Sequence, residues 1–199
     1  MKKIIYLIIL LFLITSCASK KNLSQPSYEF IEGSDLFYEV KMGDEEYDFN
    51  INMNQFSEEL ISFDWEMDMS RSGSIAIRSN ELSNAMSLKN YFSGGYKLLE
   101  NQTSVWVSKK LFNDLKSNKA VEIDLGNGQK EIFQKTTTEL FPIINKTNEK
   151  DTPIKLPVFI ILDKLGKKEI WILDDPKNRL IVMMDLDFRI DLKSWKLID

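Results

Sequence analysis

Three stretches of this chain alternate between apolar and polar residues, and this pattern constrains the fold more than any other feature of the sequence. They cover residues 47–53, 61–69 and 184–192. Successive side chains of a β-strand point to opposite faces, so strict alternation is typical of a strand with one buried and one solvated face. Such strands form antiparallel sheets that cover a core on one side. The sequence therefore predicts a largely antiparallel, half-solvated sheet.

Short polar turns rich in Gly, Asn and Asp separate further apolar runs, as hairpin connections do. Two of these runs, 156–162 and 169–174, are apolar on both faces, which predicts either the centre of the sheet or a face covered by helices. Residues 136–154 are polar and contain proline, so we expect a long loop there. The expected strands cover residues 36–41, 46–53, 61–69, 120–125, 130–135, 156–162, 169–174 and 179–192.

Two helices are expected between the strands in the middle of the chain. The first covers residues 81–90 and would be capped by Ser79 or Asn80. The second covers residues 109–117, where Ser108 is the expected cap and the apolar residues form a narrow stripe. Both are short, so the domain is predicted to consist mainly of strands.

The N-terminus has the composition of an export signal. Lys2 and Lys3 precede an apolar run at 4–14, which is too short for a stable membrane span. The run ends in Ile14-Thr15-Ser16-Cys17, which resembles the lipobox of bacterial lipoproteins. The resemblance implies that residues 1–16 are a removable signal peptide and that Cys17 carries a diacylglycerol. An ordinary secretory signal, with Cys17 near its cleavage site by chance, is the alternative.

The resemblance to bacterial lipoproteins also implies a location and a division of the chain. Position 18 is Ala rather than the Asp that retains many lipoproteins in the inner membrane, which favours the outer membrane. Lys20 and Lys21 then favour its periplasmic face, and a composition rich in Lys, Ile and Asn is compatible with Bacteroidota. We expect residues 17–30 to be a lipidated, flexible tether and residues 31–199 to form a single β-rich domain.

Residue types that are missing from the sequence exclude several kinds of function. The chain has no histidine and one cysteine, which excludes Ser-His-Asp and Cys-His catalysis and zinc sites built from those residues. Removal of residues 1–16 would leave 24 basic and 30 acidic residues, and a net charge of −6 would not attract nucleic acid. We therefore expect no cofactor and no nucleic-acid partner.

Two rows of carboxylates are candidates for a metal or acid–base site. One contains Asp64, Glu66 and Asp68, and the other Asp185, Asp187 and Asp191. Calcium loops need tight turns that direct several oxygens to one point, and neither row contains the necessary glycine. The favoured interpretation is a solvated strand face without metal, and we expect the protein not to be an enzyme.

Large apolar side chains supply the remaining candidate site. They either fill a core, which the sequence alone favours, or line a concavity suited to a hydrophobic ligand. The candidate ligand-binding residues are Phe63, Trp65, Met67, Trp106, Trp171, Met183 and Phe188.

The hairpin pattern at 168–188 and the helix pair at 80–117 resemble the outer-membrane lipoprotein-sorting carriers in the order of strands and helices. The resemblance implies an α+β, β-dominated fold: a strongly curved antiparallel sheet, or half-barrel, of about ten strands with two short helices inserted mid-chain. In those carriers the concave apolar face holds acyl chains. A shuttling carrier must be soluble, however, whereas Cys17 would tether this chain.

The leading functional hypothesis is a non-enzymatic envelope lipoprotein that binds a hydrophobic ligand or an envelope protein. The membrane itself would be a partner through the lipid anchor. An assembly subunit of an outer-membrane complex, without a small-molecule site, is the first alternative. A carboxylate-based hydrolase is the second.

Overall fold

The computed structural model describes residues 28–68, 70–126 and 128–198, which contain eleven strands and two helices. The strands are β1 (Asp35–Met42), β2 (Glu45–Phe56), β3 (Leu60–Met67), β4 (Arg71–Arg78), β5 (Gly95–Leu98), β6 (Val121–Asp124), β7 (Lys130–Lys146), β8 (Thr152–Asp163), β9 (Glu169–Leu173), β10 (Ile181–Asp185) and β11 (Arg189–Lys196). The helices are α2 (Ser79–Asn84) and α3 (Lys109–Lys116). The predicted signal peptide and Cys17 lie outside the described residues, so cleavage and lipidation stay predictions.

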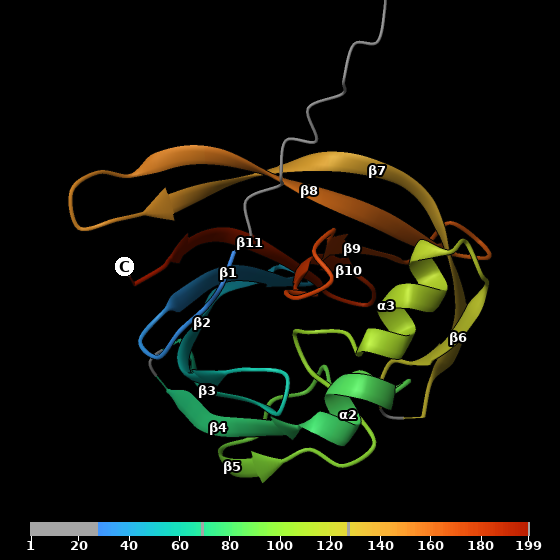
Figure 1. Cartoon of the computed structure of the whole chain (residues 1–199), viewed down its shortest axis with the longest axis horizontal. Helices are drawn as coiled ribbons and strands as arrows, with labels where there is room; N and C mark the ends of the chain where they lie inside the picture. Colours follow the sequence, from blue (N-terminus) through green and yellow to red (C-terminus); the bar gives the residue numbers. More distant parts are fainter. Residues whose placement is uncertain (1–27, 69, 127, 199) are drawn as a thin grey trace, which may run out of the picture.

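All eleven strands belong to one sheet, in the order β5-β4-β3-β2-β1-β11-β10-β9-β8-β7-β6. Figure 1 shows the sheet curving around a common interior, with α2 and α3 on one side. Neighbours are antiparallel except β4 and β5, which are joined through α2. A second parallel pairing joins the ends of β11 and β7, so that β7 to β11 close into a ring. The predicted β-dominated fold, with a curved sheet and two short helices, is confirmed.

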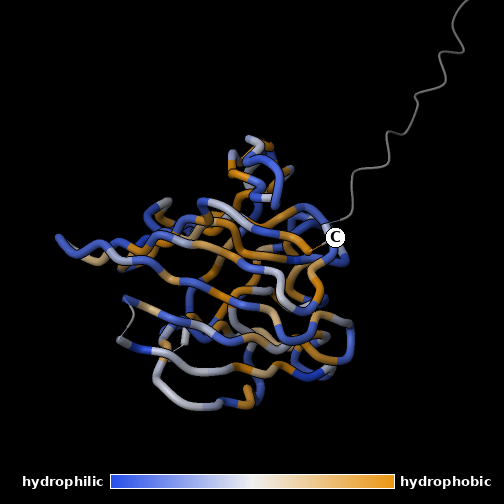
Figure 2. Tube along the Cα trace, turned by 90° about the vertical axis from the view of Figure 1, so that its left-hand side faces the viewer, coloured by the Kyte–Doolittle hydropathy of each residue, from blue (hydrophilic) through white to orange (hydrophobic). Residues whose placement is uncertain are grey.

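The alternation in β2 and β3 produces the two faces that the sequence predicted. Phe49, Ile51 and Met53 are buried, whereas the residues between them are partly or fully exposed. Figure 2 shows the resulting changes between hydrophilic and hydrophobic residues along the chain. The pairings Phe49–Met67 and Ile51–Trp65 place the buried side chains of the two strands next to each other. The register is fixed because a shift by one residue would expose every one of them.

The loop predicted at residues 136–154 is wrong, because most of this segment extends β7 and β8 into a long hairpin. The pairing continues from Phe133–Asp163 to Asn145–Thr152. In its middle part β7 pairs with β8 alone, and the other edge is open. Proline is tolerated in a strand with an open edge, so Pro142 does not end β7.

Two further boundaries differ from the sequence predictions. The expected strand 179–192 is divided into β10 and β11 by a turn in which the Leu186 amide donates to the Phe188 carbonyl, at 2.9 Å. The alternation continues through the turn, which contains neither Gly nor Pro and therefore gives no signal of it. The first helix ends at Asn84, six residues earlier than expected, because residues 87 and 88 form bridges to Asp124 and Thr103. The second helix has the predicted cap, since the Ser108 side chain accepts from the Leu111 amide.

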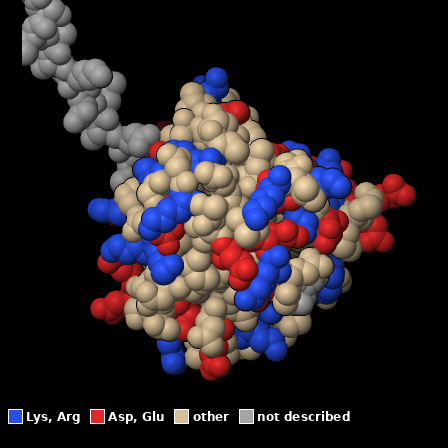
Figure 3. All heavy atoms as spheres, turned by 90° about the vertical axis from the view of Figure 1, so that its right-hand side faces the viewer, with Lys and Arg blue, Asp and Glu red and all other residues tan. Residues whose placement is uncertain are grey.

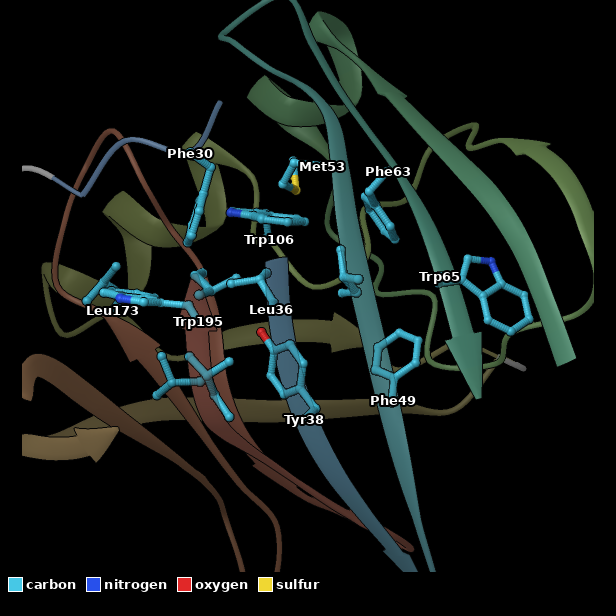
Figure 4. Close-up of a cluster of buried hydrophobic side chains, with 14 of the residues drawn as sticks. Phe30, Leu36, Tyr38, Phe49, Met53, Phe63, Trp65, Trp106, Leu173 and Trp195 are labelled. Carbon is cyan, nitrogen blue, oxygen red and sulfur yellow. The ribbon is translucent and has the colours of Figure 1, made fainter. Parts of the chain in front are cut away.

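The domain begins before residue 31, so the tether predicted to extend to residue 30 is too long. Phe30 is 1% exposed, and its ring lies edge-on to Trp106 and Trp195. The ring of Tyr28 lies 4.9 Å from that of Trp195. Figure 4 shows Phe30, Trp106 and Phe63 together in the core. Residues 28–30 therefore belong to the folded domain and close one end of its core.

Candidate functional site

A cavity of about 250 Å³ lies between the inner face of the sheet and two connecting segments. Its volume is slightly below the range of about 300–1,000 Å³ that is typical of small-molecule sites. Exposed Met42, Arg71 and Tyr91 mark its mouth. The described residues that line it are Tyr38, Val40, Met42, Tyr47, Phe49, Met67, Arg71, Lys89, Asn90, Tyr91, Phe92, Ser104, Val105, Ile181, Met184, Phe188 and Ile190.

The first wall of the cavity comes from β1 to β4. Tyr38 pairs with Phe49, Phe49 with Met67, and Met67 with Arg71, so one cross-strand row runs from the interior to the mouth. Figure 4 shows Tyr38 and Phe49 on neighbouring strands at this end of the core. Phe49 is fully buried, whereas Arg71 is exposed. The row therefore changes from apolar to cationic as it approaches solvent.

The second wall comes from β10, β11 and the turn between them. Ile190 pairs with Met184 on one side and with Val40 on the other, which joins the two walls into a continuous surface. Phe188 is half-buried in the turn. Since these residues are apolar, the wall offers no hydrogen-bonding side chain to a ligand.

The segment 89–92 covers the cavity from the side opposite the sheet. Phe92 packs on Phe49, with ring centroids 4.7 Å apart, and on Trp65 at 5.3 Å. The Lys89 amide donates to the Thr103 carbonyl at 2.7 Å, and the Asn90 side chain donates to the Leu125 carbonyl at 2.8 Å. These bonds fix the extended path of the segment, which the sequence had predicted to be helical as far as residue 90.

Val105 gives the cavity a strained backbone position. Its φ of +64° is in the left-handed region, which a β-branched residue rarely adopts. The Trp106 amide donates to the Ser104 carbonyl at 2.7 Å, so Val105 is the centre of a γ-turn. The Ile181 amide donates to the Val105 carbonyl, also at 2.7 Å, and holds the turn against β10. Strain of this kind costs about 1–3 kcal/mol and is concentrated at functional sites.

The polar side chains of the described lining are hydroxyl, amide or cationic groups, and none of them belongs to Asp or Glu. The Tyr38 hydroxyl, deep in the interior, donates to the Ile181 carbonyl at 2.9 Å, and burial raises the pKa of Tyr38 well above its usual value. Arg71 and Lys89 are the two cations. Elsewhere on the surface the charges are mixed, as Figure 3 shows for the face on the right-hand side of Figure 1. The cavity is therefore apolar inside and positive at its edge.

A second hollow, the outer groove, lies on the opposite face of the same strands and measures about 460 Å³. Its side chains include Asp35, Asp64 and Glu66, and no Lys or Arg is among the described residues that line it. The Asn52 amide donates to Asp35 at 2.7 Å, and the Ser74 hydroxyl donates to Asp64 at 2.6 Å. Much of its hydrogen-bonding capacity is thus used within the groove, as on a solvated strand face.

The structure separates the seven residues predicted from sequence into four places. Met67 and Phe188 line the cavity. Trp65 lies behind it, packed on Phe49 and Phe92. Like Trp65, the other four do not line the cavity: Phe63 and Trp106 pack on each other in the core, and Trp171 and Met183 lie near Phe141 on the ring strands.

The sequence missed most of the lining. The alternation at 47–53 and at 184–192 marked the buried faces of the strands that form both walls, so Phe49, Met184 and Ile190 had a detectable signal. Segment 89–92 and Val105, which cover the cavity, had no detectable sequence signal because neither belongs to a periodic element.

The carboxylate rows do not converge on one point. Asp64 and Glu66 lie on the outer face of β3, and Asp68 occupies a turn with a φ of +50°. Asp185 and Asp191 both bind Arg189, at 3.3 and 2.8 Å, and Asp187 is exposed. Within residues 28–68, 70–126 and 128–198, no group of three or more Cys, Asp or Glu side chains could hold a metal ion. In the same part of the chain, no helix has the length and apolar character needed to cross a membrane.

Neither a family model, nor a curated protein, nor a solved structure matches this chain. Inference about function therefore depends on the chemistry of the cavity and on the sequence around Cys17.

Proposed function

We propose that this protein is a non-enzymatic lipoprotein of the bacterial envelope that binds a hydrophobic ligand in the cavity. The observation that carries the proposal is the cavity itself: an apolar space between buried strand faces, covered by segment 89–92 and by the strained turn at Val105. The lipobox at residues 14–17 supports a lipid anchor at Cys17, which would hold the domain at the membrane.

The size and lining of the cavity favour a single hydrocarbon chain. About 250 Å³ is too small for a complete phospholipid but is sufficient for part of one chain. Each methylene that leaves water contributes about 0.8 kcal/mol, which corresponds to about a fourfold change in affinity. A chain several carbons deep would thus be retained without polar contacts to the interior.

Mass spectrometry of lipid retained by the purified full chain tests this proposal. The variant Ile190→Trp places an indole on the cavity wall, where Ile190 is half-buried, and should reduce the retained lipid at least about fivefold. Leu140→Trp is the matched control, because Leu140 is 60% exposed on β7 and does not line the cavity. Equal retention by both variants would contradict the proposal and favour the assembly-subunit alternative.

The anchor is tested separately by Cys17→Ser. Without the thiol that accepts the diacylglycerol, the chain should accumulate unprocessed or leave the membrane fraction. Cell fractionation with immunoblotting measures both. A processed chain that still fractionates with membranes after this substitution would show that Cys17 is not the anchor.

A further inference from the structure

We propose that the ligand of the cavity is a free fatty acid, whose carboxylate lies at the mouth between Arg71 and Lys89. This inference rests on the proposed function and adds the chemical class of the head group. It follows from the charges of the lining residues, the environment of the two cations and the shape of the cavity.

The charge of the lining differs from that of the chain. The protein carries 30 Asp and Glu residues against 26 Lys and Arg, a net charge of −4. The described lining of the cavity nevertheless contains Arg71, Lys89 and no carboxylate. A cationic head group would find no counter-ion there. A neutral head group would provide no negative charge to pair with the two cations. An anionic head group complements the mouth.

Arg71 is positioned over the apolar lining. Its guanidinium lies 5.6 Å from the centroid of the Tyr47 ring, which itself lines the cavity. Its ion pair with Asp68 is 3.8 Å long and joins two exposed side chains, so it is weak. A guanidinium has five N–H donors in a planar fork that suits a carboxylate, and most of them remain available to a ligand.

Lys89 is fixed through its backbone rather than through its ammonium group. Its amide donates to Thr103, and its carbonyl accepts from the Ser104 hydroxyl at 2.9 Å. Its side chain makes no ion pair within the part of the chain that the structure describes. Because Lys89 is half-buried, its charge is less screened than that of a fully exposed lysine. It therefore provides a second positive charge in the lining of the cavity, on the covering segment rather than on the sheet.

The shape of the cavity favours a single chain with a small head group. The row from Tyr38 through Phe49 and Met67 is apolar, and it ends at Arg71 at the mouth. A fatty acid matches this order, with its methylenes along the row and its carboxylate at the end. The buried Tyr38 hydroxyl is already bonded to Ile181, so the chain terminus meets no unpaired polar group there.

Photolabelling of isolated membranes that contain the full chain tests the inference. Two probes are compared, an octanoic acid with a diazirine in its chain, which is short enough for the cavity, and the octanol of the same structure. Peptide mass spectrometry measures the label on cavity residues. The acid should label these residues about fivefold to tenfold more than the alcohol does.

Charge variants then separate head-group recognition from the cavity. In the double variant Arg71→Gln with Lys89→Gln, acid labelling should fall about fivefold to tenfold, and alcohol labelling should stay the same. The control Arg78→Gln with Lys97→Gln removes two exposed cations that do not line the cavity, and it should change neither. Arg71→Lys keeps the charge but loses the planar fork, so its acid labelling should lie between that of the double variant and that of the unaltered chain.

Three results would overturn the inference. Equal labelling by acid and alcohol would contradict it while leaving the proposed function intact, because the cavity would still hold a chain. Equal loss of both labels in the double variant would also contradict it, since the cations would then support the cavity rather than recognise a head group. Absence of both labels from the cavity of the unaltered chain would overturn the proposed function as well.

Discussion

The cavity and the outer groove lie on opposite faces of the same strands, yet they differ in the charge of their lining and in how much of it is apolar. The cavity is mainly apolar, with two cations and no carboxylate among its described lining residues. The described lining of the outer groove mixes polar and apolar side chains and contains three carboxylates and no cation. Phe49 lines the cavity, whereas its neighbour Asn50 lines the outer groove. Period-two alternation thus gives one sheet two surfaces of different chemistry, and the larger hollow is not the one suited to a hydrophobic ligand.

The largest expected difference between the two faces is in stability. Phe49→Ala removes a fully buried ring that packs on Tyr38, Trp65 and Phe92, and should destabilise the fold by about 3–5 kcal/mol. Asn50→Ala changes the outer groove and should alter stability by about 0.5 kcal/mol or less. Chemical denaturation measures both. Similar effects at the two positions would contradict the assignment of the faces.

The next prediction concerns strain in the cover of the cavity. Val107→Gly should destabilise the protein by about 2–4 kcal/mol, because Val107 is 1% exposed and glycine adds conformational entropy to the unfolded chain. Val105→Gly relieves a positive φ, which offsets most of this loss, so the change should be within about 1 kcal/mol. Equal losses at the two valines would show that Val105 is not strained.

Gly73 links the two faces, because it lines the outer groove and lies against Trp65, which packs behind the cavity. A Cβ at this position would lie 2.6 Å from the Gly95 carbonyl and 3.0 Å from the Trp65 indole nitrogen. Gly73→Ala should therefore lower the free energy of unfolding by about 1–3 kcal/mol. Ser72→Ala, at the exposed neighbouring residue, should leave it almost unchanged. Thermal unfolding distinguishes them, and an unchanged Tm for Gly73→Ala would show that β4 and β5 are not held as closely as described.

The smallest expected effect is at Tyr38 and depends on pH. At neutral pH, Tyr38→Phe should lower the free energy of unfolding by about 1 kcal/mol, because the hydrogen bond to the Ile181 carbonyl is lost. Burial raises the folded-state pKa of Tyr38. Its contribution to stability is therefore complete below the unfolded pKa of about 10 and is lost as the pH rises further. Between about pH 9 and pH 11 the unaltered chain should lose more stability than Tyr38→Phe, and parallel losses would contradict the burial of this hydroxyl.

Much of the sheet could be predicted from local patterns, since alternation and Gly-, Asn- or Asp-rich turns mark most strands and hairpins, and Ser108 marks α3. Features that depend on pairing between distant residues could not be predicted in this way. The parallel pairing of β7 with β11 joins segments about fifty residues apart and has no sequence signal. The middle of β7 contains Thr and Pro, a composition typical of a loop, and it is a strand because it pairs with β8.

The candidate site was predicted less well than the fold, for a physical reason. Large apolar side chains identify a buried face, but packing decides whether they fill that face or leave a space. Trp106 and Phe63 contact each other closely, whereas Met67 and Phe188 face the cavity. The difference comes from segment 89–92, whose extended path is determined by bonds to residues 103 and 125.

The measurement that tests the central claim most directly is the position of label from an alkyl photoprobe without a charged head group. Membranes containing the full chain would be irradiated with the octanol probe, and the labelled residues would be identified by peptide mass spectrometry. The account predicts label on cavity residues such as Phe49, Met67 and Phe188, and at least about fivefold less on Asn50 or Asn52 of the outer groove. Label concentrated in the outer groove, or absent from both, would contradict it.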